Sequence, residues 1–305
     1  MTPADFESDG PLRILGIGAH PDDCEFFAGG VAAKWTAMGH EVKFVSMTQG
    51  DLGHWATVGT PLARRRADEK RRCAEILGTE SVILENRDGE LEPTLENRKA
   101  VVRLIREWRA DVVMSHRPND YHPDHRATGA LVQDAAYMVT VPFYCPDAPH
   151  LRRNPLFLFF ADEFTRPVAF RADVAVAIDD VIEKKLSVIE ALESQFYEGG
   201  CEGSADLVPR DPGGRADRRR AVRREVTELF ETYARDYRPR LAERYGAKEA
   251  DAIRFAEVFE ICEYGRSWAS ISRVARRSGE EEIRRLFPFF PARPEVYPWA
   301  GRSAP

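Results

Sequence analysis

The chain has 305 residues, of which 43% are hydrophobic, and its formal net charge at pH 7 is −6. This size allows one large α/β domain with appended elements, and the apolar content excludes a mainly disordered chain. The acidic balance argues against a nucleic-acid-binding protein, whose contact surface is usually basic.

Short apolar runs alternate with helical patterns along the first two thirds of the chain. Strands are predicted over residues 12–19, 41–47, 81–85, 111–116, 155–162 and 173–178. Helices are predicted over residues 29–39, 62–78, 97–110, 125–139 and 179–196. Strands that alternate with helices of this length imply βαβ units. The expected fold is therefore α/β, with a mainly parallel sheet between two layers of helices.

The last third has a different composition. Residues 198–214 are rich in glycine and proline and are predicted to form a loop, and a helical pattern then runs over 216–246, interrupted at Pro239. The end of the chain carries five prolines and several aromatic residues between 284 and 305. We expect this segment to pack as an extended arm across its own protomer or across a neighbouring one. In the second case the protein would be a homo-oligomer.

The five cysteines are scattered and form no CxxC pair, so neither a disulfide framework nor a thiolate zinc site is expected. A reducing cytoplasm is the predicted location. The first residues are acidic and polar, unlike a signal peptide. The chain contains no run of about 18 apolar residues, and no membrane span is predicted.

A polar turn directly follows the first predicted strand. His20, Asp22 and Asp23 stand beyond its carboxyl end, where ligands bind in parallel α/β sheets, and Pro21 stiffens the turn. Such a turn presents one imidazole and two carboxylates, which suits part of a metal site. The alternative is a loop whose aspartates only cap the next helix.

A second polar turn follows the strand predicted at 111–116. It holds three of the seven histidines, His116, His122 and His125, together with Asp120 and Asp124. Histidine and carboxylate oxygen are the ligands expected for a catalytic zinc or a similar divalent ion. If the topology places the two strands side by side, both turns can contribute to one site.

These two turns carry a resemblance to a known family. "AHPDD" (19–23), followed by a glycine pair, and "HPDH" (122–125) resemble the two signature motifs of the LmbE/PIG-L-like N-deacetylases. The resemblance implies a Rossmann-like three-layer fold and removal of the acetyl group from N-acetylglucosamine-type amino sugars or their conjugates. It also implies a bound metal, usually Zn²⁺, with another divalent ion such as Fe²⁺ as the alternative.

The resemblance divides the chain into three parts. Residues 11–198 would form the catalytic domain, and 199–279 a loop and helical insertion that includes "AEVFE" (256–260), a segment that completes the catalytic domain. Residues 280–305 would form the C-terminal arm.

The resemblance also implies catalytic and metal-binding roles for the residues of this chain that match the family motifs. The resemblance makes His20, Asp23 and His125 the metal ligands. Asp22 would be the general base that takes a proton from water. His122 would stabilise the developing oxyanion or donate a proton to the leaving amine.

Four further residues match the family more loosely and are predicted substrate contacts. Arg66 lies in an Arg-x-x-Glu helix, although a charged helix face is an equal alternative. Asp88 follows the third strand, where a plain Asp-Gly turn is the competing interpretation. Asp120 and Tyr121 precede the second motif and would shape the pocket.

The chain also departs from the family pattern. Many members continue their first motif with a glutamate, whereas here Cys24 follows the aspartates and Glu25 comes one residue later. We expect Cys24 to be a packed residue rather than a ligand. Leu192 stands where the family often has a histidine.

The sequence therefore predicts a zinc-dependent N-deacetylase that acts on a small amino-sugar substrate. One alternative is a non-catalytic sugar- or metabolite-binding protein on the same scaffold. Another is a metal-dependent hydrolase of a different amide or ester, including a phosphoesterase, because His/Asp clusters also hold two-metal sites.

Overall fold

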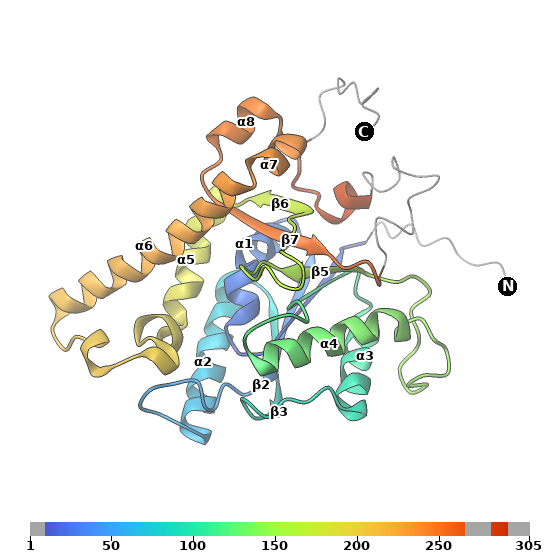
Figure 1. Ribbon diagram of the computed structural model, residues 1–305, viewed down its shortest axis with the longest axis horizontal. Helices are drawn as coiled ribbons and strands as arrows, with labels where there is room; N and C mark the ends of the chain where they lie inside the picture. The colour runs from blue at the N-terminus through green and yellow to red at the C-terminus, as the bar shows by residue number, and fades with distance from the viewer. Residues whose placement is uncertain (1–9, 266–281, 292–305) are drawn as a thin grey trace.

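The computed structural model describes residues 10–265 and 282–291. A seven-stranded sheet in the order β3-β2-β1-β4-β5-β7-β6 runs through the molecule (Figure 1). Neighbouring strands are parallel from β3 to β5, whereas β7 runs antiparallel to both β5 and β6. The strands are β1 (Arg13–Gly18), β2 (Glu41–Thr48), β3 (Glu80–Asn86), β4 (Val112–Ser115), β5 (Leu156–Phe160), β6 (Val174–Ala177) and β7 (Ala256–Ile261).

Helices cover both faces of this sheet. They are α1 (Asp23–Ala37), α2 (Thr60–Leu77), α3 (Leu95–Trp108), α4 (Pro123–Met138), α5 (Ile182–Ala191), α6 (Pro212–Asp236), α7 (Arg238–Tyr245) and α8 (Ala247–Ala252). Successive side chains of β1 point to opposite faces, as a strand requires. Ile14 packs into the apolar cluster that includes residues of α1, α2 and α5, whereas Leu15 and Ile17 pack into the cluster that includes α3 and α4. The predicted three-layer α/β fold is thus confirmed.

The first helix begins earlier than the sequence predicts. The pattern places it over 29–39, but α1 starts at Asp23, so that Gly29 and Gly30 lie inside the helix. Glycine weakens helix interiors, so two adjacent glycines inside α1 need a reason. The structure supplies one, since side chains of α5 and β7 approach the helix backbone closely at this point.

The sheet also contains a strand that the apolar pattern did not predict. Residues 256–261 form β7, which separates β5 from β6. The predicted helix over 179–196 is likewise divided, because α5 ends at Ala191 and a π-helical turn follows at Glu193–Tyr197. Sequence periodicity predicts neither feature, since the pairing of β7 depends on distant strands and the π-helical turn involves only one turn of the chain.

The last third of the described chain packs against the sheet rather than apart from it. Helices α6 and α7 meet at Tyr237, so Pro239 lies in the first turn of α7, where proline is tolerated. Within residues 282–291, Leu286 and Phe287 are fully buried, and Phe287 packs against Trp35 of α1 with 5.2 Å between ring centroids. This part of the C-terminal arm therefore packs on its own chain, and the remainder of the arm lies outside the described residues.

Candidate metal-dependent active site

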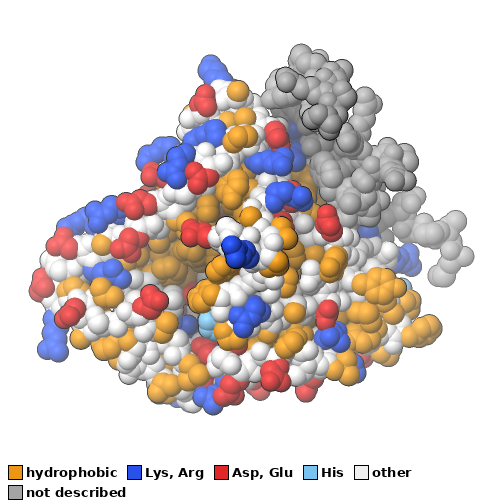
Figure 2. All heavy atoms as spheres, viewed as in Figure 1, with side chains coloured by type: hydrophobic (Ala, Val, Ile, Leu, Met, Phe, Trp, Pro, Cys, Tyr) orange, Lys and Arg blue, Asp and Glu red, His pale blue; other side chains and the backbone are white. Residues whose placement is uncertain are grey.

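The two polar turns meet at the point where the strand order reverses. β1 pairs with β2 on one side and with β4 on the other, in parallel register. Ligands bind at such switch points, beyond the carboxyl ends of the strands. His20 follows β1 and His116 follows β4, and the adjacency that the sequence could only assume is present. Figure 2 shows a histidine side chain in a recess of the molecular surface.

The three predicted metal ligands converge. His20 Nδ1 lies 3.2 Å from His125 Nε2 and 3.7 Å from Asp23 Oδ2, and His125 Nε2 lies 3.5 Å from Asp23 Oδ1. Ligand atoms about 2.0–2.1 Å from a shared tetrahedral zinc ion would be separated by about 3.3 Å. The spacing of these side chains therefore fits a single tetrahedral ion.

Each of these histidines has an outer carboxylate. His20 Nε2 lies 3.2 Å from Asp124 Oδ2, and His125 Nδ1 lies 3.2 Å from Asp120 Oδ1. When each ring donates that N–H to its carboxylate, the other nitrogen carries a lone pair. The two lone pairs then face each other beside Asp23, an arrangement that a cation stabilises.

The electrostatics of the site also favour a bound cation. Burial alone would lower the pKa of His20, but the hydrogen bond to Asp124 and the charges of Asp23, Asp22 and Asp88 raise it to about 9. The pKa of Asp23 is held well below its ordinary value, because the opposing effect of burial is outweighed by His125, His116 and His20. The site thus attracts positive charge, in the form of a proton or a metal ion.

The cluster contains further potential ligands. Three groups of side chains have donor atoms close enough to share a cation: His20, His122 and His125; Asp23, His116 and His125; and His20, Asp88 and Asp124. The sequence analysis predicts no specific role for His116. It is buried, its Nε2 lies 3.0 Å from Asp23 Oδ2, and its ring stacks on His125 with 4.0 Å between centroids. In the sequence, its position directly after the strand that forms β4 is the feature that indicates a place in the site.

Replacing Asp124 by Asn is expected to weaken Zn²⁺ binding about 10–100-fold, because His20 loses the carboxylate that orients its ring. Zn²⁺ affinity measured by competition with a chromophoric chelator tests this. Asp134→Asn is the matched control, since Asp134 lies on the same helix but pairs with Arg98 at the surface. Equal affinities of the two variants would contradict the role given to Asp124.

Asp22 is placed differently from its neighbour Asp23. It occupies the N-cap position of α1, yet its side chain accepts no capping hydrogen bond from the first turn. The alternative in which Asp22 serves as a helix cap is therefore wrong. Burial and the charge of Asp23 raise the pKa of Asp22 to about 6, although Arg66 and His20 act in the opposite direction. Its carboxylate is available for proton transfer.

His122 is half-buried beside the same cluster, with its ring centroid 4.6 Å from that of His20. Its Nδ1 accepts the Asp124 N–H at the start of α4, at 3.2 Å. The pKa of His122 is lowered by burial and by the charges of His20 and His125. A neutral ring that accepts at Nδ1 carries its proton on Nε2, so His122 can donate a hydrogen bond from that atom.

The predicted substrate contacts differ in accessibility. Tyr121 is 72% exposed, and its ring lies 5.8 Å from those of both His122 and His125. Asp120 accepts the His122 backbone N–H at 2.8 Å in addition to its contact with His125, so it is a partner of a predicted metal ligand.

Arg66 and Asp88 are both buried beneath the loop that follows β2. Arg66 donates from Nη2 to Gly53 O at 2.7 Å and to Gln195 Oε1 at 2.6 Å. Asp88 accepts the N–H groups of Gly50 and Leu52. Both side chains hold this loop in place, and their contact with substrate stays a prediction.

The departures from the family pattern also have structural counterparts. Leu192 is buried in the apolar cluster that includes α1 and α5, which suits a packing role for this side chain. Cys24 is fully buried, and burial raises the pKa of its thiol well above the ordinary value, which suits a packed residue. Glu25 forms a buried ion pair with Lys70 of α2, with 2.8 Å between Oε1 and Nζ.

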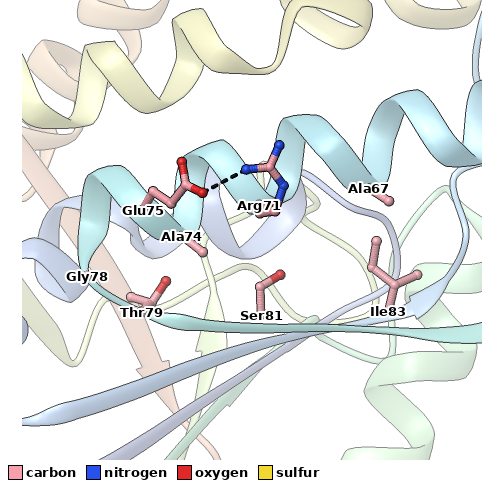
Figure 3. Close-up of a pocket in the computed structure, with 8 residues that line it drawn as sticks. All are labelled: Ala67, Arg71, Ala74, Glu75, Gly78, Thr79, Ser81 and Ile83. Atoms are coloured by element: carbon pink, nitrogen blue, oxygen red, sulfur yellow. Dashed lines mark hydrogen bonds and ion pairs between the residues drawn. The ribbon is translucent and has the colours of Figure 1, made fainter.

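A separate hollow lies between α2 and the edge strand β3 (Figure 3). Arg71 and Glu75 form an ion pair of 2.7 Å along one wall, and Ser81 and Ile83 of β3 lie opposite. None of the predicted site residues lines it. Among the described residues, no helix has the length and apolar character needed to cross a bilayer.

The fold and the site together define an α/β protein with a His/Asp cluster that could hold a cation at the switch point of its sheet. The chain belongs to the PIG-L family, described as GlcNAc-PI de-N-acetylase, whose model matches residues 15–136. It is 30% identical over 269 residues to the diacetylchitobiose deacetylase of Thermococcus kodakarensis, covering 84% of this chain and 88% of that protein.

Two further comparisons bear on fold and reaction. The N,N'-diacetylchitobiose deacetylase of Pyrococcus horikoshii superimposes with a TM-score of 0.64 and 25% identity, over 82% of this chain and 84% of that one. The 4-oxalmesaconate hydratase of Pseudomonas putida is 23% identical over 191 residues, covering 60% of this chain and 74% of that protein. Relatives of this chain thus include a protein named for a different reaction.

Proposed function

We propose that this chain is a metal-dependent N-deacetylase that removes the acetyl group from an N-acetylglucosamine-type amino sugar or its conjugate. The observation that carries the proposal is the convergence of His20, Asp23 and His125. The carboxylate of Asp22, which makes no capping hydrogen bond to α1, is close enough to interact with Asp23 and His20. The similarity to the Thermococcus deacetylase over most of both chains supports the choice of substrate class.

The metal, Zn²⁺ in the first instance and Fe²⁺ as the alternative, would be held by His20, Asp23 and His125 and would act as a Lewis acid that makes water more acidic. Asp22 takes one proton from the attacking water as its oxygen bonds to the amide carbon. His122 donates from Nε2 to the developing oxyanion. The proton held by Asp22 passes to the leaving nitrogen as the C–N bond breaks, which yields the free amine and acetic acid, and the acid loses its remaining proton to solvent.

The insertion and the C-terminal arm would influence which amino sugar binds. We propose residues 11–198 together with β7 as the catalytic unit, and the rest of 199–279 and the arm over 280–305 as modifiers of substrate choice. Gly200 O accepts the Trp55 N–H at 2.9 Å, and Glu198 lies 2.8 Å from His54 Nε2. These bonds attach the start of the insertion to the loop after β2. A cytoplasmic location remains our prediction from the cysteine content.

Metal analysis of the purified protein, combined with amine release from N-acetylglucosamine, its methyl glycoside and N,N'-diacetylchitobiose, tests the proposal. About one zinc ion per chain, with amine release that stops on chelation and returns on adding Zn²⁺, is the expected result. Metal without amine release from any of the three would contradict the deacetylase. It would favour hydrolysis of another amide or ester, or hydration as in the Pseudomonas relative. Neither metal nor amine would favour a binding protein.

A further inference from the structure

A buried ion pair lies against the middle of α1. Lys185 of α5 and Glu257 of β7 are both buried, with 2.6 Å between Nζ and Oε1. Buried charges cost free energy unless they are paired and hydrogen-bonded. The ammonium of Lys185 also lies over the ring of Phe230, 4.6 Å from its centroid. The other hydrogen-bond partners of the pair are backbone groups of α1.

The ion pair binds both backbone donors and a backbone acceptor of α1. Glu257 accepts the N–H groups of Gly30 and Val31, each at 2.8 Å, through its two carboxylate oxygens. Lys185 Nζ donates to the carbonyl oxygen of Phe26. In a regular α-helix the Gly30 N–H bonds to the carbonyl of Phe26, four residues earlier. The ion pair therefore contacts the N–H and the carbonyl that a regular helix pairs with each other at this turn.

The glycine pair makes this approach possible. A Cβ atom on Gly30 would lie 2.9 Å from Glu257 Oε1 and 2.8 Å from a methyl carbon of Ile178. A Cβ atom on Gly29 would lie 3.2 Å from Lys185 Cδ. Only glycine leaves room for the carboxylate at position 30, so the two glycines after "AHPDD" serve the ion pair.

The turn held in this way leads directly to the site. Phe26 N–H donates to Asp22 O at 2.8 Å, so the residue whose carbonyl Lys185 contacts lies one helical turn from the proposed base. Asp23, the carboxylate of the predicted ligand set, is the first residue of the same helix.

We propose that Lys185 and Glu257 are positioning residues for Asp22 and Asp23. They fix the first turns of α1 relative to α5 and β7, and so set where the two carboxylates stand. The segment containing Glu257 is thereby a functional part of the site, although it is more than 220 residues away along the chain. A change in activity bears on this role only through the proposed function, whereas a change in metal binding does not depend on it.

The test compares the parent with Lys185→Met/Glu257→Gln, a double variant that leaves no uncompensated charge. Co²⁺ affinity by chelator competition and the Co²⁺ absorption spectrum are measured at a temperature where circular dichroism shows both proteins folded. We expect the double variant to bind Co²⁺ about 10–100-fold more weakly, with a changed spectrum. In amine release, we expect kcat to fall while KM stays within about twofold, since substrate contacts are untouched.

Trp35→Phe is the matched control. It removes a hydrogen bond from Trp35 Nε1 to Leu286 O at the other end of α1 and leaves the ion pair intact. It should lower the unfolding midpoint without altering Co²⁺ affinity or spectrum. Parent-like Co²⁺ binding by the double variant would overturn the proposal and leave the pair a stabilising element only.

A milder variant covers the case in which the double variant does not fold. Gly29→Ala places a methyl group against the Lys185 stem and displaces it by a small amount. A lowered Co²⁺ affinity in folded Gly29→Ala supports the proposal, and an unchanged affinity and spectrum overturn it. If the parent binds Co²⁺ but releases no amine from any substrate, the proposed function fails while this comparison still decides the role of the ion pair.

Discussion

Asp22→Asn is expected to reduce amine release about 10²–10⁴-fold, the range usually lost with a general base. Asparagine keeps the shape of the side chain but cannot accept the proton of the attacking water. Asp22 accepts no capping bond in α1, so the substitution removes no contact that begins this helix. The measurements are kcat on the best substrate and zinc content per chain, and zinc content should equal that of the parent.

The neighbouring variant Asp23→Asn gives the contrast. Asp23 is a predicted metal ligand, and its carboxylate lies 3.7 Å from His20 Nδ1 and 3.5 Å from His125 Nε2. We expect Asp23→Asn to lose zinc as well as turnover, and the unfolding midpoint of both variants is measured to separate misfolding from loss of function. Asp22→Asn with parent-like turnover would remove Asp22 from the mechanism.

The location of the site can be predicted from the sequence because it depends on local patterns. Each polar turn directly follows an apolar strand, and the carboxyl ends of parallel strands form one edge of the sheet. His20 and His125, 105 residues apart in the chain, can therefore be assigned to one site if their strands are neighbours. The sequence does not specify which strands are neighbours, and it is the β1–β4 pairing that brings the two turns together.

The roles of the outer carboxylates cannot be predicted in the same way. The sequence suggests that Asp120 shapes the pocket and points to no role for Asp124, yet they contact His125 and His20 respectively. A histidine ring has two nitrogen atoms, and which one faces a metal depends on the partner of the other. That partner is fixed by side-chain geometry, which sequence spacing does not specify.

The glycine pair shows a third limit. In the sequence, Gly29 and Gly30 are compatible with close helix–strand packing or tight backbone geometry, but the carboxylate that approaches them comes from β7. β7 itself is not predicted as a strand, because its antiparallel position between β5 and β6 interrupts the βαβ order on which the prediction rests. Contacts between such distant segments are the part of this fold that local patterns leave undetermined.

The second large effect concerns stability and the other ion pair of α1. Lys70→Met is expected to lower the free energy of unfolding by about 3–5 kcal/mol, because it leaves the buried carboxylate of Glu25 without its partner. Lys70 and Glu25 are both buried, and Glu25 Oε2 has no hydrogen-bond partner among the described residues. Burial alone would lower the pKa of Lys70, but the charge of Glu25 raises it, so Lys70 is protonated at neutral pH.

The cost of this variant would come from the unpaired charge and not from the loss of an attractive bond, and a second variant separates the two. Glu25→Leu/Lys70→Met replaces the pair by apolar side chains of similar volume, and such replacements are often neutral or stabilising by about 1–4 kcal/mol. Urea unfolding of the parent, the single and the double variant measures the difference. We expect the double variant to regain most of the stability that Lys70→Met loses. If both variants are equally destabilised, the packing around α1 and α2 requires the ion pair itself, and the unpaired-charge explanation is wrong.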